Sequence, residues 1–90
     1  MWEYNVSNSK VKRDRTEIFA QILKLCAKPT VKTRIMYQTN LSYNTLLTIL
    51  KQLRNFELLT LDKRTRKYAT TCKGLEYITR WTAVQELLET

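Results

Sequence analysis

Two predicted helices separated by a very short turn constrain the fold of this chain more than any other feature. Thr33 is a suitable N-cap for a short helix that runs to about Thr39. Asn40 and Leu41 form the turn, and Ser42 caps a longer helix. The apolar residues of the longer helix share one narrow face at about 100° per residue; they are Leu46, Ile49, Leu50 and Leu53. The two helices are therefore expected to pack on a common core.

A helix is also predicted before this pair. Asp14 followed three residues later by Glu17 is an N-terminal signature. Apolar residues then recur at helical spacing through Ala27; they are Ile18, Phe19, Ile22, Leu25 and Cys26. Pro29 closes this helix because the residue before a proline is steered away from helical angles.

A short β-hairpin with a basic tip follows the longer helix. Residues 58–61 read as one strand and residues 67–70 as its return, joined by a tip that begins at Asp62. Four of the five residues from 63 to 67 are positively charged: Lys63, Arg64, Arg66 and Lys67. Such a cluster repels itself unless salt or a phosphate backbone neutralises it, so nucleic-acid contact is expected, with a solvated tip as the alternative.

The last predicted helix spans about residues 71–89, with Thr71 as its cap, and carries two apolar stripes about 100° apart. The first stripe is Leu75, Ile78 and Thr82, and it is expected to close the monomer's core. The second has heptad spacing and consists of Tyr77, Trp81, Val84 and Leu88, with Leu87 near it. We expect the second stripe to form a homodimer interface. The alternative is that an N-terminal arm, residues 1–13, covers it within one chain.

The charge balance favours a polyanionic partner. The chain of 90 residues carries 16 lysines and arginines against 8 acidic residues, a net charge of +8. It has neither a run of about 18 apolar residues nor a secretory leader at its polar start, so nucleic acid is favoured over a membrane. These observations predict a cytoplasmic, nucleoid-associated protein with one folded domain, residues 14–90.

Metal binding and catalysis are not expected. Histidine is absent, and Cys26 and Cys72 lie too far apart in the sequence to form a metal-binding pair. The two cysteines are interpreted as reduced packing residues, with a disulfide as the less favoured alternative. The chain also lacks paired carboxylates and a glycine-rich phosphate loop, so neither an enzyme nor a cofactor-binding protein is predicted.

The outer face of the longer helix carries amides, hydroxyls and a base without a carboxylate, which suits base edges and phosphates. Asn44 can address adenine and Lys51 guanine. The residues predicted to contact DNA from this helix and its cap are Ser42, Tyr43, Asn44, Thr45, Thr48 and Lys51. Lys32 and Arg34, with Tyr43, would hold phosphates, while Arg64 and Arg66 would contact backbone or minor groove, supported by Lys63 and Lys67.

The order of elements predicts an α+β, mainly helical chain: a winged helix-turn-helix with a three-helix core, the hairpin as a basic wing and a C-terminal dimerisation helix. The stretch Lys-Thr-Arg-Ile-Met-Tyr-Gln-Thr-Asn-Leu-Ser-Tyr at residues 32–43 resembles the helix-turn-helix of small archaeal winged-helix DNA-binding proteins, the ten-a group and its viral relatives. Residues 68–78, Tyr-Ala-Thr-Thr-Cys-Lys-Gly-Leu-Glu-Tyr-Ile, are similar to the junction Y-x-L-T-x-K-G between wing and helix in wider winged-helix regulators. The resemblance covers roughly residues 14–80.

The resemblance implies a dimer through the C-terminal helix, double-stranded DNA as ligand, a recognition helix in the major groove and no enzymatic activity. The chain departs from the family's pattern at three places. The glycine after the recognition helix is missing from residues 55–58, so Asn55 is expected to make that helix end. The wing also lacks glycine, and the C-terminal helix is shorter than the coiled-coil arm of the ten-a proteins.

The sequence therefore predicts a sequence-specific double-stranded DNA-binding protein that regulates transcription as a homodimer. One alternative is a general chromosome-associated DNA-binding protein. Another is a winged-helix module that binds a protein partner in a larger assembly. RNA binding is less favoured because the hairpin offers only Tyr68 for stacking on bases.

Overall fold

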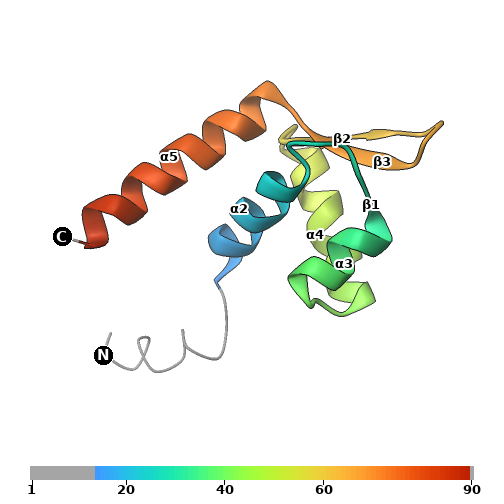
Figure 1. Cartoon of the computed structure of the whole chain (residues 1–90), viewed down its shortest axis with the longest axis horizontal. Helices are drawn as coiled ribbons and strands as arrows, with labels where there is room; N and C mark the ends of the chain where they lie inside the picture. Colours follow the sequence, from blue (N-terminus) through green and yellow to red (C-terminus); the bar gives the residue numbers. More distant parts are fainter. Residues whose placement is uncertain (1–13, 90) are drawn as a thin grey trace.

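The computed structural model describes residues 14–89, and Figure 1 shows the arrangement of their helices and strands. The architecture is mainly helical with a small antiparallel sheet, which confirms the predicted α+β class. The elements in chain order are α2 (Arg15–Leu25), β1 (Thr30–Val31), α3 (Lys32–Thr39), α4 (Tyr43–Asn55), β2 (Leu59–Asp62), β3 (Lys67–Thr70) and α5 (Cys72–Glu89). The predicted N-terminal arm, residues 1–13, lies outside the described residues.

Three of the four predicted helix starts are confirmed by a side-chain cap. Asp14 accepts a hydrogen bond from the Glu17 amide at 3.0 Å, and Ser42 accepts one from the Thr45 amide at 3.3 Å. At the start of α5, the Gly74 amide donates to the Thr71 hydroxyl at 3.0 Å.

The prediction that Thr33 is the N-cap of α3 was wrong, because α3 already begins at Lys32, one residue before Thr33. Val31 occupies the N-cap position and makes no side-chain hydrogen bond there. The chain passes straight from a strand into the helix, so Thr33 already lies in the first turn.

A third strand, β1, joins the predicted hairpin and gives the sheet the order β1-β3-β2. Both pairings are antiparallel, with Thr30 opposite Tyr68 and Leu61 also opposite Tyr68. The strand β1 was not predicted from sequence. The sheet brings the start of α3 next to the wing, which matters for the surface described below.

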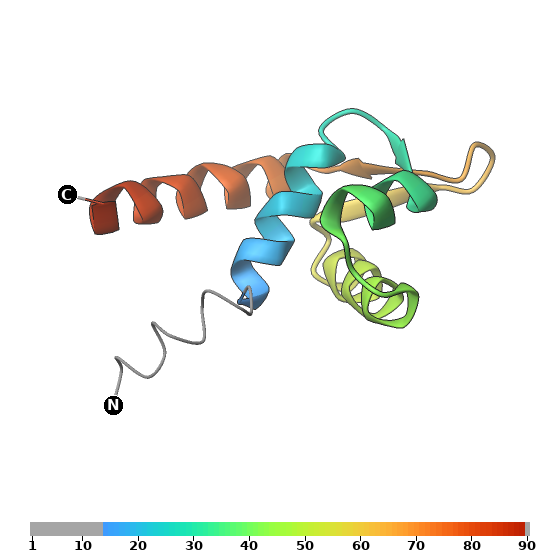
Figure 2. The ribbon, with the colours of Figure 1, turned by 60° about the horizontal axis from the view of Figure 1, so that its bottom comes forward.

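The core lies between α2, α3, α4 and the inner side of the sheet (Figure 2). Its fully or nearly fully buried members are Phe19, Ile22, Leu23, Cys26, Ile35, Leu46, Ile49, Leu50, Leu53, Leu58, Leu59 and Tyr68. The predicted apolar stripe of the longer helix is therefore confirmed as its buried face. Burying such aliphatic side chains contributes roughly 1.5–3 kcal/mol each to folding.

The helix α4 ends at Asn55, but the residue that takes the place of the missing glycine after the helix is Glu57 and not Asn55. Glu57 has a φ of 63°, the left-handed conformation usual for the residue after a helix cap. The Glu57 amide donates to the Arg54 carbonyl and the Leu58 amide to the Leu53 carbonyl, both at 2.9 Å. This pair of hydrogen bonds is a Schellman motif, and it buries Leu58 beside Leu53.

Two other residues adopt the left-handed conformation in turns. Asn40, φ 58°, ends α3 and makes the predicted tight turn, as asparagine readily does. Arg66, φ 62°, closes the wing, where its amide donates to the Asp62 carbonyl at 2.7 Å. The wing therefore turns without glycine.

The helix α5 packs against α2 with its first half and then extends away from the body (Figures 1 and 2). The predicted division of its two stripes is only partly right. Ile78 does pack on the core, but Leu75 is 48% exposed and does not close it. Tyr77 takes part instead, because its ring lies 6.2 Å from that of Phe19 and its hydroxyl donates to the Thr16 carbonyl.

Candidate nucleic-acid interface

The outer face of α4 is exposed along its whole length. All six residues predicted to reach DNA from this helix and its cap are solvent-exposed: Ser42, Tyr43, Asn44, Thr45, Thr48 and Lys51. The helix carries Arg54 in its last turn and has no acidic residue in its first. A surface of this kind can approach a polyanion along the whole helix without meeting a carboxylate of α4.

Some of the polar groups on this face are already used inside the helix. The Ser42 hydroxyl donates to the Thr45 hydroxyl at 2.9 Å and also caps the helix. The Thr48 hydroxyl donates to the Asn44 carbonyl at 3.1 Å, one helical turn earlier. No hydrogen bond within residues 14–89 engages the side-chain amide of Asn44 or the ammonium of Lys51. These two groups are therefore free to bind a ligand at this face.

Lys32 connects the start of α3 to the start of α4. Its ammonium lies 5.3 Å from the centre of the Tyr43 ring and 3.4 Å from the Tyr43 hydroxyl. The pair places a positive charge and a phenolic hydroxyl side by side at the N-terminal end of α4. This is a suitable arrangement for a phosphate oxygen beside the helix.

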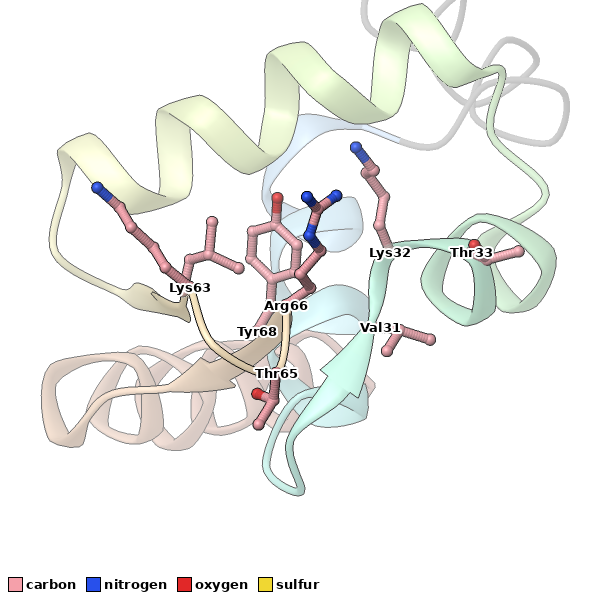
Figure 3. A pocket seen from close by; sticks show the side chains of 8 residues that line it. Val31, Lys32, Thr33, Lys63, Thr65, Arg66 and Tyr68 are labelled. Carbon is pink, nitrogen blue, oxygen red and sulfur yellow. The ribbon is translucent and has the colours of Figure 1, made fainter.

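A hollow of about 690 Å³ lies between the start of α3 and the wing. Figure 3 shows Lys63 and Lys32 at its two sides and Arg66 between them, with the charged ends of all three toward α4. Tyr68, whose ring is buried, forms part of the lining between them. The structure thus brings three of the predicted basic residues together on the side of the molecule that α4 occupies.

The other predicted basic residues lie outside this hollow. Arg34, Arg64 and Lys67 are all exposed, and none of them lines it. The backbone amide of Arg64 donates to the Asp62 carboxylate at 2.9 Å, so this carboxylate is held by the turn of the wing. Arg64 and Lys67 are therefore open to solvent, and no ion pair within residues 14–89 joins them to Asp62.

Sequence reasoning missed two residues of this surface. Arg54 lines a second hollow, of about 520 Å³, together with Lys51 and residues of β2. Arg54 follows Lys51 by three residues, so the two lie on neighbouring turns of one helix face. This spacing could have identified Arg54 from the sequence. Leu47 is exposed on α4, although the buried stripe contains the other leucines of that helix.

The electrostatics of the interface are one-sided. Between residues 28 and 67 the carboxylates are Glu57 and Asp62, against nine lysines and arginines. Across residues 14–89 the one ion pair joins Arg80 to Glu76, and both lie on α5. The cations of α3, α4 and the wing therefore have no carboxylate partner in the described chain, so this surface has a positive potential that would favour an anionic ligand.

The predicted dimer stripe on α5 is covered by α2 at one end and open at the other. At the covered end, the Lys24 ammonium of α2 lies 5.1 Å from the centre of the Trp81 ring. Tyr77 is partly buried there, and this burial raises the pKa of its hydroxyl. Two hollows, of about 390 and 330 Å³, meet at Tyr77. Val84 lines the smaller hollow and is 51% exposed, and Leu88 lies beyond it and is 74% exposed.

The cysteines and charged side chains offer no metal site in the described part of the chain. Both cysteines are free, and no group of three or more potential ligands occurs within residues 14–89. Cys26 is buried as expected, but Cys72 is exposed and was wrongly taken as a packing residue. Burial raises the pKa of Cys26 to about 12. None of the helices described here has the length and apolar character needed to cross a membrane.

Comparison with known proteins gives one family. The family model described as winged helix-turn-helix matches residues 12–89, nearly the whole chain. No curated protein gives a significant match.

Proposed function

Because the chain belongs to the winged helix-turn-helix family, we propose that it is a sequence-specific double-stranded DNA-binding protein that regulates transcription as a homodimer. The observation that carries the proposal is the exposed outer face of α4, free of carboxylates and flanked by the basic hollow beneath the wing. The resemblance of residues 32–43 to the ten-a group of archaeal proteins supports the same reading. The proposal includes no catalytic step.

In the proposed complex α4 enters the major groove, which is wide enough to admit a helix. The Asn44 amide addresses the N6 and N7 positions of adenine, and Lys51 addresses O6 and N7 of guanine. Lys32 and Tyr43 hold a phosphate at the start of the helix, because their polar ends lie 3.4 Å apart. These phosphate contacts set the register in which the bases are read.

The wing contributes the remaining charge. Lys63 and Arg66 face the same hollow as Lys32, so the backbone that passes Lys32 can also meet the wing. Arg64, further out on the tip, is placed to reach along the backbone or into a narrow minor groove, where arginine is favoured. Contacts of this type strengthen binding to every sequence.

The proposed dimer uses the open part of α5. Val84 and Leu88 continue the heptad spacing of Tyr77 and Trp81 beyond the region that α2 covers. An exposed apolar stripe at the end of a projecting helix is stabilised when a second copy covers it. A dimer would also present two recognition helices to one duplex.

Salt-dependent binding to short duplexes tests the DNA-binding part of the proposal. Log affinity should fall linearly with log salt, with a slope of about −0.9 for each phosphate neutralised. Replacing Asn44 or Lys51 by alanine should change the preferred sequence, whereas the Arg64→Ala, Arg66→Ala double variant should weaken all sequences alike. Affinity that does not respond to salt, or the reverse pattern of variants, contradicts the proposal.

Lys28→Ala is the matched control for the loss of a cation. Lys28 is exposed in the connection between α2 and β1, which Figure 2 shows on the opposite side of the molecule from α4. Its removal should leave both affinity and sequence preference unchanged. A loss equal to that of the wing variants would mean that binding follows net charge and not the proposed surface.

Sedimentation equilibrium tests the dimer. Leu88→Glu places a carboxylate on the open stripe and should shift the protein toward monomer. Thr79→Glu adds the same charge on the opposite side of α5 and should leave the dimer intact. A wild-type protein that sediments as a monomer at micromolar concentration would refute the proposed dimer.

A further inference from the structure

Leu47 is the aliphatic side chain that the packing of α4 leaves exposed. It is 37% exposed, while the four leucines and isoleucines of the buried stripe are at most 7% exposed. It belongs neither to the core cluster nor to the partly buried residues packed against that cluster. An isolated exposed leucine is ordinary on a protein surface, so its exposure alone does not indicate a function. The residues beside it on the helix have to be considered as well.

Leu47 lies among the residues of α4 that are proposed to contact DNA bases. Leu47 follows Asn44 by three residues and precedes Lys51 by four, so the three share one side of α4. Tyr43, one turn earlier, brings the phosphate-binding pair next to it. Any duplex that meets Asn44 and Lys51 therefore lies against Leu47 as well.

Thr48 enlarges the apolar spot. Its hydroxyl is used in the hydrogen bond to the Asn44 carbonyl, 3.1 Å away. The branch of the side chain without a partner is the γ-methyl group. Between the amide of Asn44 and the ammonium of Lys51 the face thus presents a leucine and a methyl group, with no free donor of their own.

We propose that Leu47, together with the γ-methyl of Thr48, contacts the C5-methyl group of thymine in the major groove. Thymine is the only standard base that offers a methyl group there, and apolar side chains read it. The contact favours a thymine between the positions read by Asn44 and Lys51. The inference rests on the proposed function, because it requires α4 to lie in the major groove.

Replacing single thymines by deoxyuridine in a bound duplex tests the contact, because uracil lacks only the methyl group. The duplex is one selected for binding the wild-type protein, and affinities are measured at one salt concentration by fluorescence anisotropy. At one thymine of each half-site the wild type should lose about fourfold in affinity, the effect of exposing one methyl-sized group. Other thymines should be insensitive.

The decisive comparison is between protein variants on the same pair of duplexes. Leu47→Ala removes the contact from both half-sites, so it should bind the thymine duplex about sixteenfold more weakly, about fourfold for each half-site, and show no further loss on the uracil duplex. Leu47→Met keeps an apolar side chain and should retain the sensitivity. Leu75→Ala, which shortens an exposed leucine on α5, should behave as the wild type.

The outcomes separate this inference from the proposed function. If the wild type binds duplex DNA but no thymine responds to uracil, the contact is refuted and the proposed function stands. The same holds if wild type and Leu47→Ala lose equally on uracil substitution. If the wild type binds no duplex at all, the proposed function itself fails.

Discussion

Replacing Gly74 by alanine should destabilise the protein, although alanine is the better helix former. Gly74 is buried near the start of α5, where the helix crosses the end of the sheet. A Cβ atom there would lie 2.3 Å from the Leu58 carbonyl oxygen and 2.6 Å from the Cγ2 atom of Thr70. Both distances are well inside van der Waals contact, so one of the partners has to move.

The Leu58 oxygen has little freedom to move. It accepts a hydrogen bond from the Thr71 amide at 3.1 Å, and the Leu58 amide closes the Schellman motif of α4. We expect a clash with such a backbone group to cost about 3 kcal/mol, the upper end for overpacking. Helix propensity returns at most about 1 kcal/mol, so the net loss is about 2 kcal/mol.

Thermal unfolding followed by circular dichroism measures the effect. For a domain of this size a loss of about 2 kcal/mol lowers the Tm by roughly 8–16 °C. Thr79→Ala, on the exposed side of the same helix, should instead raise it slightly, because alanine is the better helix former and the Thr79 hydroxyl bonds only to the Leu75 carbonyl of its own helix. An unchanged or higher Tm for Gly74→Ala would show that α5 does not pack as closely as described.

Three further predictions concern the helix end, the thiols and the phosphate contact. Glu57→Gly should stabilise the protein by about 0.5–1 kcal/mol in urea unfolding, because glycine tolerates the left-handed φ, whereas Glu57→Ala should bring no such gain. At pH 8 a disulfide reagent should label Cys72 rapidly and Cys26 only after unfolding, because burial raises the pKa of Cys26 to about 12; two fast thiols would contradict the packing of α2. Lys32→Met should weaken binding to all duplexes alike and reduce the salt slope of the dimer by about 2, about 1 for each subunit; a change in sequence preference would place Lys32 on a base instead.

Features determined by local chemistry could be predicted from the sequence. Asp14 and Ser42 cap their helices because their short polar side chains reach amides three residues later. The buried stripe of α4 follows from its 3.6-residue period, and the same period implies the exposed outer face. This covers the fold class and the exposure of the outer face of α4.

Features that depend on distant segments could not be predicted in this way. The strand β1 has two residues and exists because β3 lies beside it, so no pattern of its own marks it. Leu75 is exposed because α2 meets α5 along Tyr77 and Ile78. Glu57 adopts a conformation that glycine favours because burying Leu58 against Leu53 requires a Schellman motif there.

The same limit applies to the candidate site. That Lys32, Lys63 and Arg66 are basic is evident from the sequence, but their meeting around one hollow is not. It follows from the pairing of Val31 with Lys67, which joins the start of α3 to the wing. The Lys32 contact with Tyr43 has the same origin, since it depends on the packing of α3 against α4.

Selection of bound duplexes from a random pool at a defined salt concentration tests the central claim most directly. A homodimer that reads DNA with α4 should enrich a two-fold symmetric site whose half-sites are about one helical turn, or a multiple of it, apart. Each half-site should contain an adenine and a guanine, read by Asn44 and Lys51. Recovery of a pool with no enriched sequence, at salt where the protein still binds, would contradict sequence-specific recognition by this face.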